Sequence, residues 1–273
     1  MNETNGERSA RQPESKNAIT RDRYNAVLLD LDGVITDTAS IHAACWKQMF
    51  DEYLQKRATQ RGEVFRPFDI ATDYRLYVDG KRRYDGVRDF LISRGIRLPQ
   101  GNSDDPPQAE TVDGLGNRKN DLVNKIIEEK GVEPYEGSVE LIHQLRRQGF
   151  KIAVVTSSQN CTTVLKAAKL DHFFDAQVDG NVIHAQQLAG KPAPDTYLMA
   201  AKLLAVEPAR AVVIEDALSG VEAGSNGNFG LVIGVARKGN NDELRHHGAH
   251  LVVNNLGELV SRPSPQHLGS KSS

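Results

Sequence analysis

Residues Ala26–Leu31 form a short apolar run, AVLLDL, which charged residues precede and which ends at Asp32-Gly33. A run of this length that is apolar at successive positions is typical of a strand buried on both faces. Such a strand needs helices on both sides of its sheet, which favours an α/β fold. The sequence therefore predicts a buried strand whose carboxyl end carries Asp30 and Asp32.

Short apolar strands and helices alternate along the second half of the chain. Further strands are expected at Lys151–Val155, Phe174–Val178, Ala211–Ile214, Leu231–Val235 and His250–Val253. The helices of this part are expected at Ser138–Gln148, Thr162–Lys169, Asp195–Ala205 and Gly220–Asn226. This order implies right-handed crossovers and a mainly parallel, Rossmann-like sheet.

The stretch between the first strand and Gly131 has no strand pattern. Helices are expected at Thr38–Lys56, Gly86–Arg94 and Arg118–Lys130, and the Gly-, Pro- and Asp-rich residues Gly101–Gly116 are expected to form a loop. Ligands of open α/β sheets bind at the carboxyl ends of the strands, so an insertion after the first strand covers the site. We expect a core domain of residues 25–36 and 132–260 and a helical cap domain of residues 37–131.

Both ends of the chain are polar. Residues 1–24 lack the apolar stretch of a secretory signal and are expected to form a disordered arm, and residues 261–273 a disordered tail. No apolar run approaches the roughly 18 residues that a membrane span needs. The two cysteines, Cys45 and Cys161, have no metal-ligand spacing, so we expect them to be reduced and packed inside a cytoplasmic protein.

The charge balance limits the possible partners. The formal net charge of −2 argues against nucleic acid or an anionic membrane as the main partner. An anionic substrate would have to meet a local cluster of cations. Because 39% of the residues are apolar and 26% are charged, the chain has the composition of an ordinary globular enzyme.

Asp30 and Asp32 are two residues apart at the end of the first strand. Alternate residues of a strand point to the same side, so both carboxylates would face one pocket. One could attack phosphorus while the other moves a proton to or from an oxygen. A turn capped by an aspartate is the alternative interpretation of the same pattern.

Three further segments follow predicted strands or precede helices. Thr156, Ser157 and Ser158 could donate to phosphate oxygens or could cap the next helix. Lys191 precedes the stiff turn PAPD and could equally be a surface lysine. Glu215 and Asp216 follow AVVI and, with Asp30, would form an oxygen-rich site suited to magnesium, unless they belong to a solvated turn.

The order of these segments, DxD, Thr/Ser, Lys and Glu-Asp, resembles the four signature motifs of the haloacid dehalogenase superfamily. The stretch AVLLDLDGVITDTASIHAACWKQMF, with KPAPD and IEDALSG, resembles its β-phosphoglucomutase and sugar-phosphatase branch. The resemblance spans about residues 26–253 and implies a haloacid dehalogenase-type core with a cap. It also implies that Asp30 is the nucleophile, Asp32 the general acid/base, Thr156 a phosphoryl ligand and Lys191 a charge-neutralising group. Magnesium would be held by the residues Asp30, Asp32 (through its backbone carbonyl), Glu215 and Asp216.

The same resemblance assigns substrate-binding roles around the cap. Thr38 and His42 resemble residues that report cap closure to Asp32, and Arg83 resembles the cap arginine that binds the non-reacting phosphate. The remaining positions with implied substrate contacts are Lys119 in the cap, and Ser158 and Asn160 in the core. For His42 and Arg83, a satisfied histidine and a solvated charge remain the alternatives, and Trp46 is interpreted as cap core.

One position departs from the mutase pattern. Gln159 stands where a lysine is expected, which weakens the predicted grip on a second phosphate. The leading hypothesis is therefore a monomeric β-phosphoglucomutase that acts on a sugar phosphate, with a sugar-phosphate phosphatase as the alternative. A third hypothesis is a catalytically silent regulatory domain, which the intact acids disfavour. The fragment Gly114-Leu115-Gly116 is set aside as a dinucleotide motif because it lies in the predicted loop.

Overall fold

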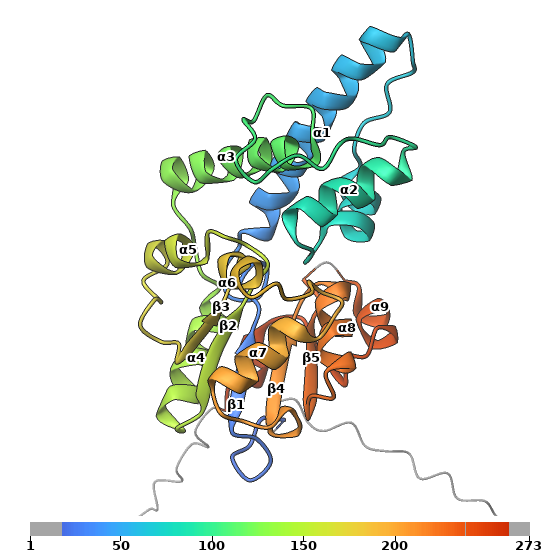
Figure 1. The fold of residues 1–273 in the computed structure, drawn as a ribbon. Helices are drawn as coiled ribbons and strands as arrows, with labels where there is room; N and C mark the ends of the chain where they lie inside the picture. The colour runs from blue at the N-terminus through green and yellow to red at the C-terminus, as the bar shows by residue number, and fades with distance from the viewer. Residues whose placement is uncertain (1–17, 238, 262–273) are drawn as a thin grey trace, which may run out of the picture.

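The computed structural model describes residues 18–237 and 239–261. Its centre is one sheet of six parallel strands in the order β3-β2-β1-β4-β5-β6 (Figure 1). The strands are β1 (Ala26–Leu29), β2 (Lys151–Val155), β3 (Ala176–Val178), β4 (Ala211–Glu215), β5 (Leu231–Val235) and β6 (Leu251–Val253). The prediction of an α/β fold with a parallel sheet is confirmed. The first strand ends two residues earlier than expected, at Leu29.

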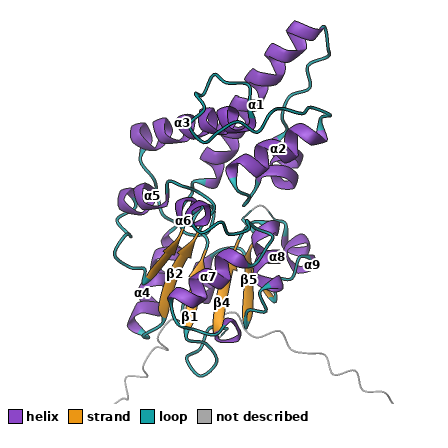
Figure 2. Cartoon of the chain, viewed as in Figure 1, coloured by secondary structure: helices purple, strands orange, loops and turns teal. Residues whose placement is uncertain are grey.

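Helices cover both faces of this sheet (Figure 2). Alternate residues of β1 enter two separate apolar clusters, Val27 and Leu29 on one face and Ala26 and Leu28 on the other. The first cluster includes residues of α4 (Glu136–Arg147), α5 (Cys161–Ala167) and the short helix η4 (Leu256–Leu259). The second includes residues of α6 (Gly180–Ala185), α7 (Asp195–Leu203), α8 (Leu218–Asn226) and α9 (Asn241–His246). A further short helix, η3 (Pro208–Arg210), precedes β4.

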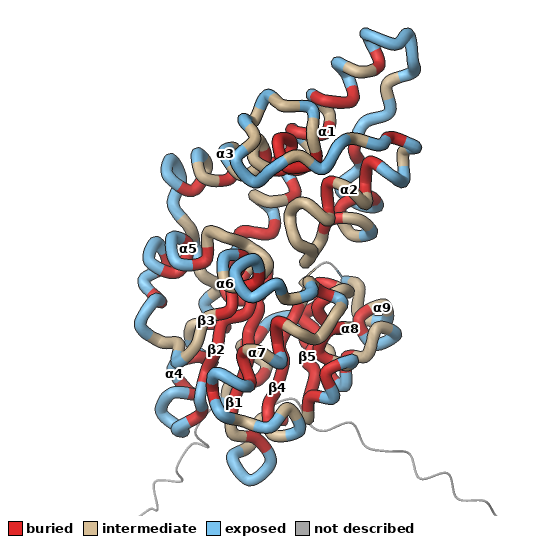
Figure 3. The backbone as a smooth tube through the Cα atoms, in the orientation of Figure 1, coloured by how far each residue is buried: buried red, intermediate tan, exposed pale blue. Residues whose placement is uncertain are grey.

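The segment between β1 and α4 forms a second, helical body above the carboxyl ends of the strands (Figure 1). It contains α1 (Ala39–Arg61), η2 (Ile70–Val78), α2 (Arg83–Ser93) and α3 (Val112–Lys130). This body has an apolar core of its own, in which the rings of Phe50 and Phe90 lie 4.2 Å apart. Trp46 is buried in this core, and Figure 3 shows buried segments in both bodies. The domain boundaries at residues 36 and 131 stay a prediction.

The predicted loop Gly101–Gly116 is wrong in its last five residues, which form the first turn of α3. The turn starts because the Thr111 side chain accepts a hydrogen bond from the Gly114 N–H, at 2.9 Å. Glycine is required here for close packing. A Cβ at Gly114 would lie 2.5 Å from the Ala109 carbonyl oxygen, and one at Gly116 would lie 2.6 Å from the Tyr84 ring. Glycines that indicated a loop by composition therefore belong to a helix that packs tightly.

The arm predicted for residues 1–24 is wrong for residues 18–24, which lie against the core. Ala18 and Tyr24 are buried, and the Tyr24 hydroxyl donates to the Gly230 carbonyl at 3.2 Å. Residues 1–17 of the predicted arm, and residues 262–273 of the predicted tail, lie outside the described part of the chain. Within residues 18–237 and 239–261, the helices are all too short or too polar to span a bilayer.

Candidate active site

A buried ion-pair cluster lies at the carboxyl ends of β1 and β4. The Lys191 ammonium donates to Asp30 Oδ1 at 2.6 Å and to Glu215 Oε1 at 2.5 Å. Glu215 has no exposed surface, and its two oxygens also accept from the Tyr197 hydroxyl and the Ala217 N–H. Lys191 is therefore a buried cation that neutralises the Asp30 carboxylate, not a surface lysine.

The protonation of this cluster depends on its burial. Burial raises the pKa of Asp30 well above its ordinary value, and the Lys191 charge opposes that rise, while Glu215 and Asp32 add to it. Burial lowers the pKa of Lys191, but the attraction of Asp30 and Glu215 is larger and keeps it well above the ordinary value. The positive charge of Lys191 beside Asp30 thus favours the ionised form of this carboxylate against the effect of burial.

Asp32 is held by groups from both bodies. The Thr38 hydroxyl donates to Asp32 Oδ1, His42 Nε2 lies 3.4 Å from the same oxygen, and the Thr156 hydroxyl donates to Oδ2 at 3.3 Å. Burial alone would raise the pKa of Asp32, but His42, Thr38 and Lys119 together lower it. Asp32 is accordingly ionised in this arrangement, because these neighbours stabilise its negative charge.

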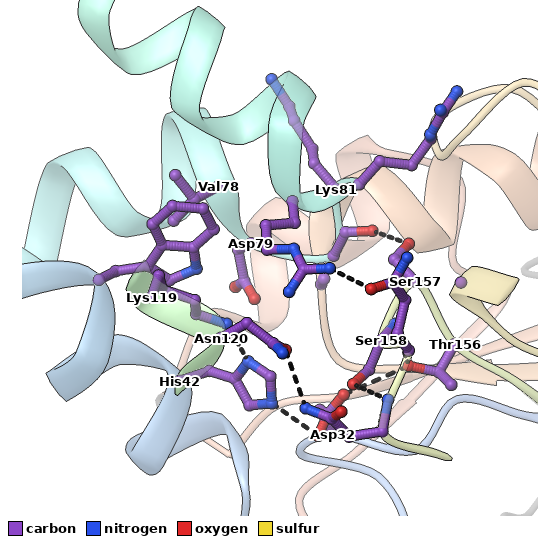
Figure 4. A pocket seen from close by; sticks show the side chains of 18 of the residues that line it. Asp32, His42, Val78, Asp79, Lys81, Lys119, Asn120, Thr156, Ser157 and Ser158 are labelled. Atoms are coloured by element: carbon purple, nitrogen blue, oxygen red, sulfur yellow. Dashed lines mark hydrogen bonds and ion pairs between the residues drawn. The ribbon is translucent and has the colours of Figure 1, made fainter. Parts of the chain in front are cut away.

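Two basic side chains of the cap approach Asp32 in series (Figure 4). Lys119 Nζ lies 2.6 Å from His42 Nδ1 and 4.9 Å from the centre of the Trp46 ring. Burial is the largest cause that lowers the pKa of both groups, and it brings the pKa of Lys119 to about 7. Neither base is a solvated side chain.

A pocket of about 90 Å³ lies between the two bodies and contains most of the predicted site. Its lining includes the predicted residues Asp30, Asp32, His42, Arg83, Lys119, Thr156, Ser158, Asn160 and Asp216. Three predicted residues do not line the pocket. Thr38 donates to Asp32, and Lys191 donates to both Asp30 and Glu215. The tertiary structure therefore brings the predicted residues together.

Direct contacts close the pocket between cap and core. The Arg83 guanidinium donates to the Gln159 side-chain carbonyl, and the Asn160 amide donates to Asn120 Oδ1 at 3.1 Å. The Ser157 hydroxyl donates to the Gly80 carbonyl at 2.8 Å. Arg83 and Gln159 thus line the pocket as a contact pair that joins cap and core.

Some lining residues were not predicted from the sequence. Asn120 and the turn Asp79-Gly80 line the pocket, as do Tyr74 and His184. Asn120 directly follows Lys119, so its position in the sequence next to a predicted site residue could have indicated that it lines the pocket. Tyr74 lies on η2, a π-helix, whose period differs from that of an α-helix and leaves no ordinary helical pattern to recognise.

Three carboxylates could hold a metal ion. Oxygens of Asp30, Glu215 and Asp216 lie within 4.8 Å of one another. The Asp216 carboxylate occupies the space that a side chain at position 33 would need, because a Cβ at Gly33 would lie 2.0 Å from Asp216 Oδ2. Carboxylate oxygens are the donors that Mg²⁺ prefers, so the chemistry of the group fits that ion. Because Glu215 already accepts from three protein donors, Asp30 and Asp216 are the acids best suited to direct coordination.

The family model of haloacid dehalogenase-like hydrolases matches residues 24–228. The chain belongs to the haloacid dehalogenase superfamily. Within it, the chain is 51% identical over 242 residues to the β-phosphoglucomutases of Mycobacterium bovis and Mycobacterium tuberculosis, a match that covers 88% of this chain and 92% of each relative. It is also 35% identical over 139 residues to a trehalose-phosphate phosphatase of Mycobacterium leprae, which covers 50% of this chain and 30% of that protein.

A solved structure agrees with this assignment. The β-phosphoglucomutase from Clostridium difficile has a TM-score of 0.68 and 25% identity, with 86% of this chain and 93% of that one covered. This haloacid dehalogenase member is therefore an enzyme of the β-phosphoglucomutase-like branch that transfers phosphoryl groups. The hypothesis of a catalytically silent domain is wrong.

Proposed function

We propose that this enzyme interconverts β-glucose 1-phosphate and glucose 6-phosphate through a phosphorylated Asp30 and a bisphosphate intermediate. The observation that carries the proposal is a pocket lined by both bodies. The core acids Asp30 and Asp32 and the cap cation Arg83 all line it, and Arg83 donates to the core residue Gln159. A sugar with two phosphates needs a cationic group besides the reacting acids, and the 51% identity to two β-phosphoglucomutases supports this substrate.

The side chains fit the steps of such a transfer. An Asp30 oxygen would attack the phosphorus of the bisphosphate, while Lys191, hydrogen-bonded to this carboxylate, limits charge repulsion. Asp32 would give the departing sugar oxygen the proton that it takes up in the return step. In the return step Asp32 would take the proton from the sugar hydroxyl that attacks phospho-Asp30, and Thr38 and Thr156 hold its carboxylate for both transfers.

A bound magnesium ion would supply positive charge that stabilises the transferring phosphoryl group. The residues that would hold it are Asp30 and Asp216, the Asp32 carbonyl implied by the family pattern, and Glu215, which also anchors Lys191. We further propose a cytoplasmic monomer. The free, buried thiols of Cys45 and Cys161 support a reducing compartment, and light scattering during size-exclusion chromatography tests the monomer.

The alternative is a sugar-phosphate phosphatase in which water attacks phospho-Asp30. Gln159 favours it, because a neutral amide contacts Arg83 where the mutase pattern has a second cation. A second phosphate would be bound less tightly with one cation fewer. The partial similarity to a trehalose-phosphate phosphatase is compatible with this alternative.

The experiment incubates the protein with magnesium and β-glucose 1-phosphate, with and without glucose 1,6-bisphosphate, and follows phosphorus by NMR. Glucose 6-phosphate that the bisphosphate stimulates is the expected result. Release of free phosphate without formation of glucose 6-phosphate would contradict the mutase and support the phosphatase. The Asp30→Asn variant should fold and lose essentially all turnover in either case, and retained turnover would refute the assignment of the nucleophile.

A further inference from the structure

A second cavity, of about 440 Å³, adjoins the active site and is larger than the 90 Å³ pocket that holds the predicted residues. Its lining includes residues of η2 in the cap, such as Ala71, and residues of the core segments that follow β4 and β5, such as Leu218. A water molecule occupies about 30 Å³ in the liquid, so the cavity has room for several. The cavity can therefore hold water close to the reacting groups.

The two cavities share one wall, which consists of Tyr74, Asp79 and Asp216. Tyr74 is the large side chain of the three, is 5% exposed and packs within the cap core. Burial, and then the charges of Asp79 and Asp216, raise the pKa of its hydroxyl well above the ordinary value. The wall is thus built around an uncharged aromatic ring that the cap contributes.

Contacts between cap and core keep this wall in place. Arg75, the residue after Tyr74, forms an ion pair with Glu243 of α9 at 2.5 Å. The Ser219 hydroxyl donates to the Asp79 carbonyl at 2.9 Å. Both contacts join η2 or its end to the core, so they hold Tyr74 in its place between the two cavities.

We propose that Tyr74 is a water gate that keeps the second cavity apart from phospho-Asp30 and so favours phosphoryl transfer to a sugar over hydrolysis. This inference rests on the proposed phosphorylation of Asp30. In the reaction that the gate prevents, a water oxygen bonds to phosphorus and the bond between phosphorus and the Asp30 oxygen breaks. The products are the free Asp30 carboxylate and orthophosphate, and Asp32 takes the proton of the water.

The experiment measures the lifetime of the phosphorylated enzyme. Acetyl phosphate and magnesium are added to the full chain, excess donor is removed, and intact mass spectrometry follows the loss of the phosphoryl group. Four variants are compared with the unmodified protein. Tyr74→Ala opens the wall, Tyr74→Leu opens it partly while keeping an apolar side chain, and Tyr74→Phe keeps the ring. Tyr77→Ala removes a tyrosine from the same helix that lines neither cavity.

We expect Tyr74→Ala to shorten the lifetime about tenfold or more, which corresponds to a barrier lower by about 1.4 kcal/mol. The lifetime of the Tyr74→Leu variant should lie between those of Tyr74→Ala and the unmodified protein. If the alanine variant does not fold, the lifetime of the leucine variant decides the outcome. Tyr74→Phe and Tyr77→Ala should keep the original lifetime. Equal lifetimes in all folded variants would overturn the gate, as would an effect of Tyr77→Ala or Tyr74→Phe equal to that of Tyr74→Ala. A protein that gains no phosphoryl group from acetyl phosphate would instead overturn the proposed function and the gate with it.

Discussion

Lys191 is the residue on which the buried charges of the site depend, because it contacts both Asp30 and Glu215 and is itself buried. Removing one partner of a buried ion pair leaves an uncompensated charge, which costs far more than the loss of an exposed pair. This asymmetry leads to a stability prediction that is independent of catalysis.

Lys191→Met should lower the free energy of unfolding by about 3–5 kcal/mol at neutral pH. The loss should shrink as the pH falls, since protonation of Asp30 relieves the repulsion between the two acids. Urea unfolding at several pH values measures both effects. Lys56→Met, which removes an exposed pair with Glu110, is the control and should cost less than about 1 kcal/mol. An equal loss of unfolding free energy in the two variants would contradict the prediction that Lys191 compensates buried charges.

Lys119 gives a pH-dependence prediction. Its pKa in the folded chain is about 7, and an unfolded lysine has a pKa of about 10.4. Between these values the unfolded chain binds more protons, so the contribution of Lys119 to the free energy of unfolding rises with pH. From pH 7 to 9 the unmodified protein should therefore gain stability relative to Lys119→Met. Urea midpoints of the two proteins at each pH test this, and parallel curves would contradict it.

At the scale of elements, the first turn of α3 shows how a close contact outweighs a residue's intrinsic preference. Glycine costs about 1 kcal/mol relative to alanine inside a helix, so Gly116→Ala would stabilise an isolated helix. In the folded chain the added Cβ would lie 2.6 Å from the Tyr84 ring of α2. The packing of α3 against α2 therefore depends on the missing side chain.

We expect Gly116→Ala to destabilise the protein by about 1–3 kcal/mol, because the ring must move to admit the methyl group. Glu128→Ala, at an exposed position of the same helix, should change stability by less than about 0.5 kcal/mol. Urea unfolding compares the two. A stabilised Gly116→Ala protein would mean that α2 and α3 are not packed as described.

At the scale of the whole molecule, the proposed metal site joins strands that are far apart in the sequence, so a bound ion should stabilise the entire fold. A ligand that binds only the native state adds about 2.7 kcal/mol when its concentration is 100 times its Kd. Magnesium should therefore raise the melting temperature. The shift should vanish in Asp216→Ala and persist in Asp242→Ala, which removes an exposed aspartate of α9. Thermal melts with and without magnesium provide the test, and a shift in Asp216→Ala equal to that of the unmodified protein would place the ion elsewhere.

The amino-acid order determined the parts of this protein that depend on local pattern. The apolar strands predicted the parallel sheet, and the acids that follow two of them were predicted to meet at its carboxyl edge, whereas the place of Lys191 beside Asp30 was implied only by the family resemblance. This succeeded because neighbouring parallel strands end at the same edge, so residues just beyond Leu29 and Ile214 are neighbours in space wherever the chain runs between them. The same reasoning failed for Gly114 and Gly116, whose roles depend on partners that no local pattern reveals.

Only the tertiary structure decided how the cap meets the core. The pairing of Arg83 with Gln159, the approach of Lys119 to His42, and the place of Tyr74 between two cavities all join residues from separate segments. Their burial also sets their protonation, since the pKa of Lys119 falls because the closed fold removes it from water. Sequence patterns carry the periodicity of each element, whereas distances between elements and the loss of solvent arise only when those elements pack.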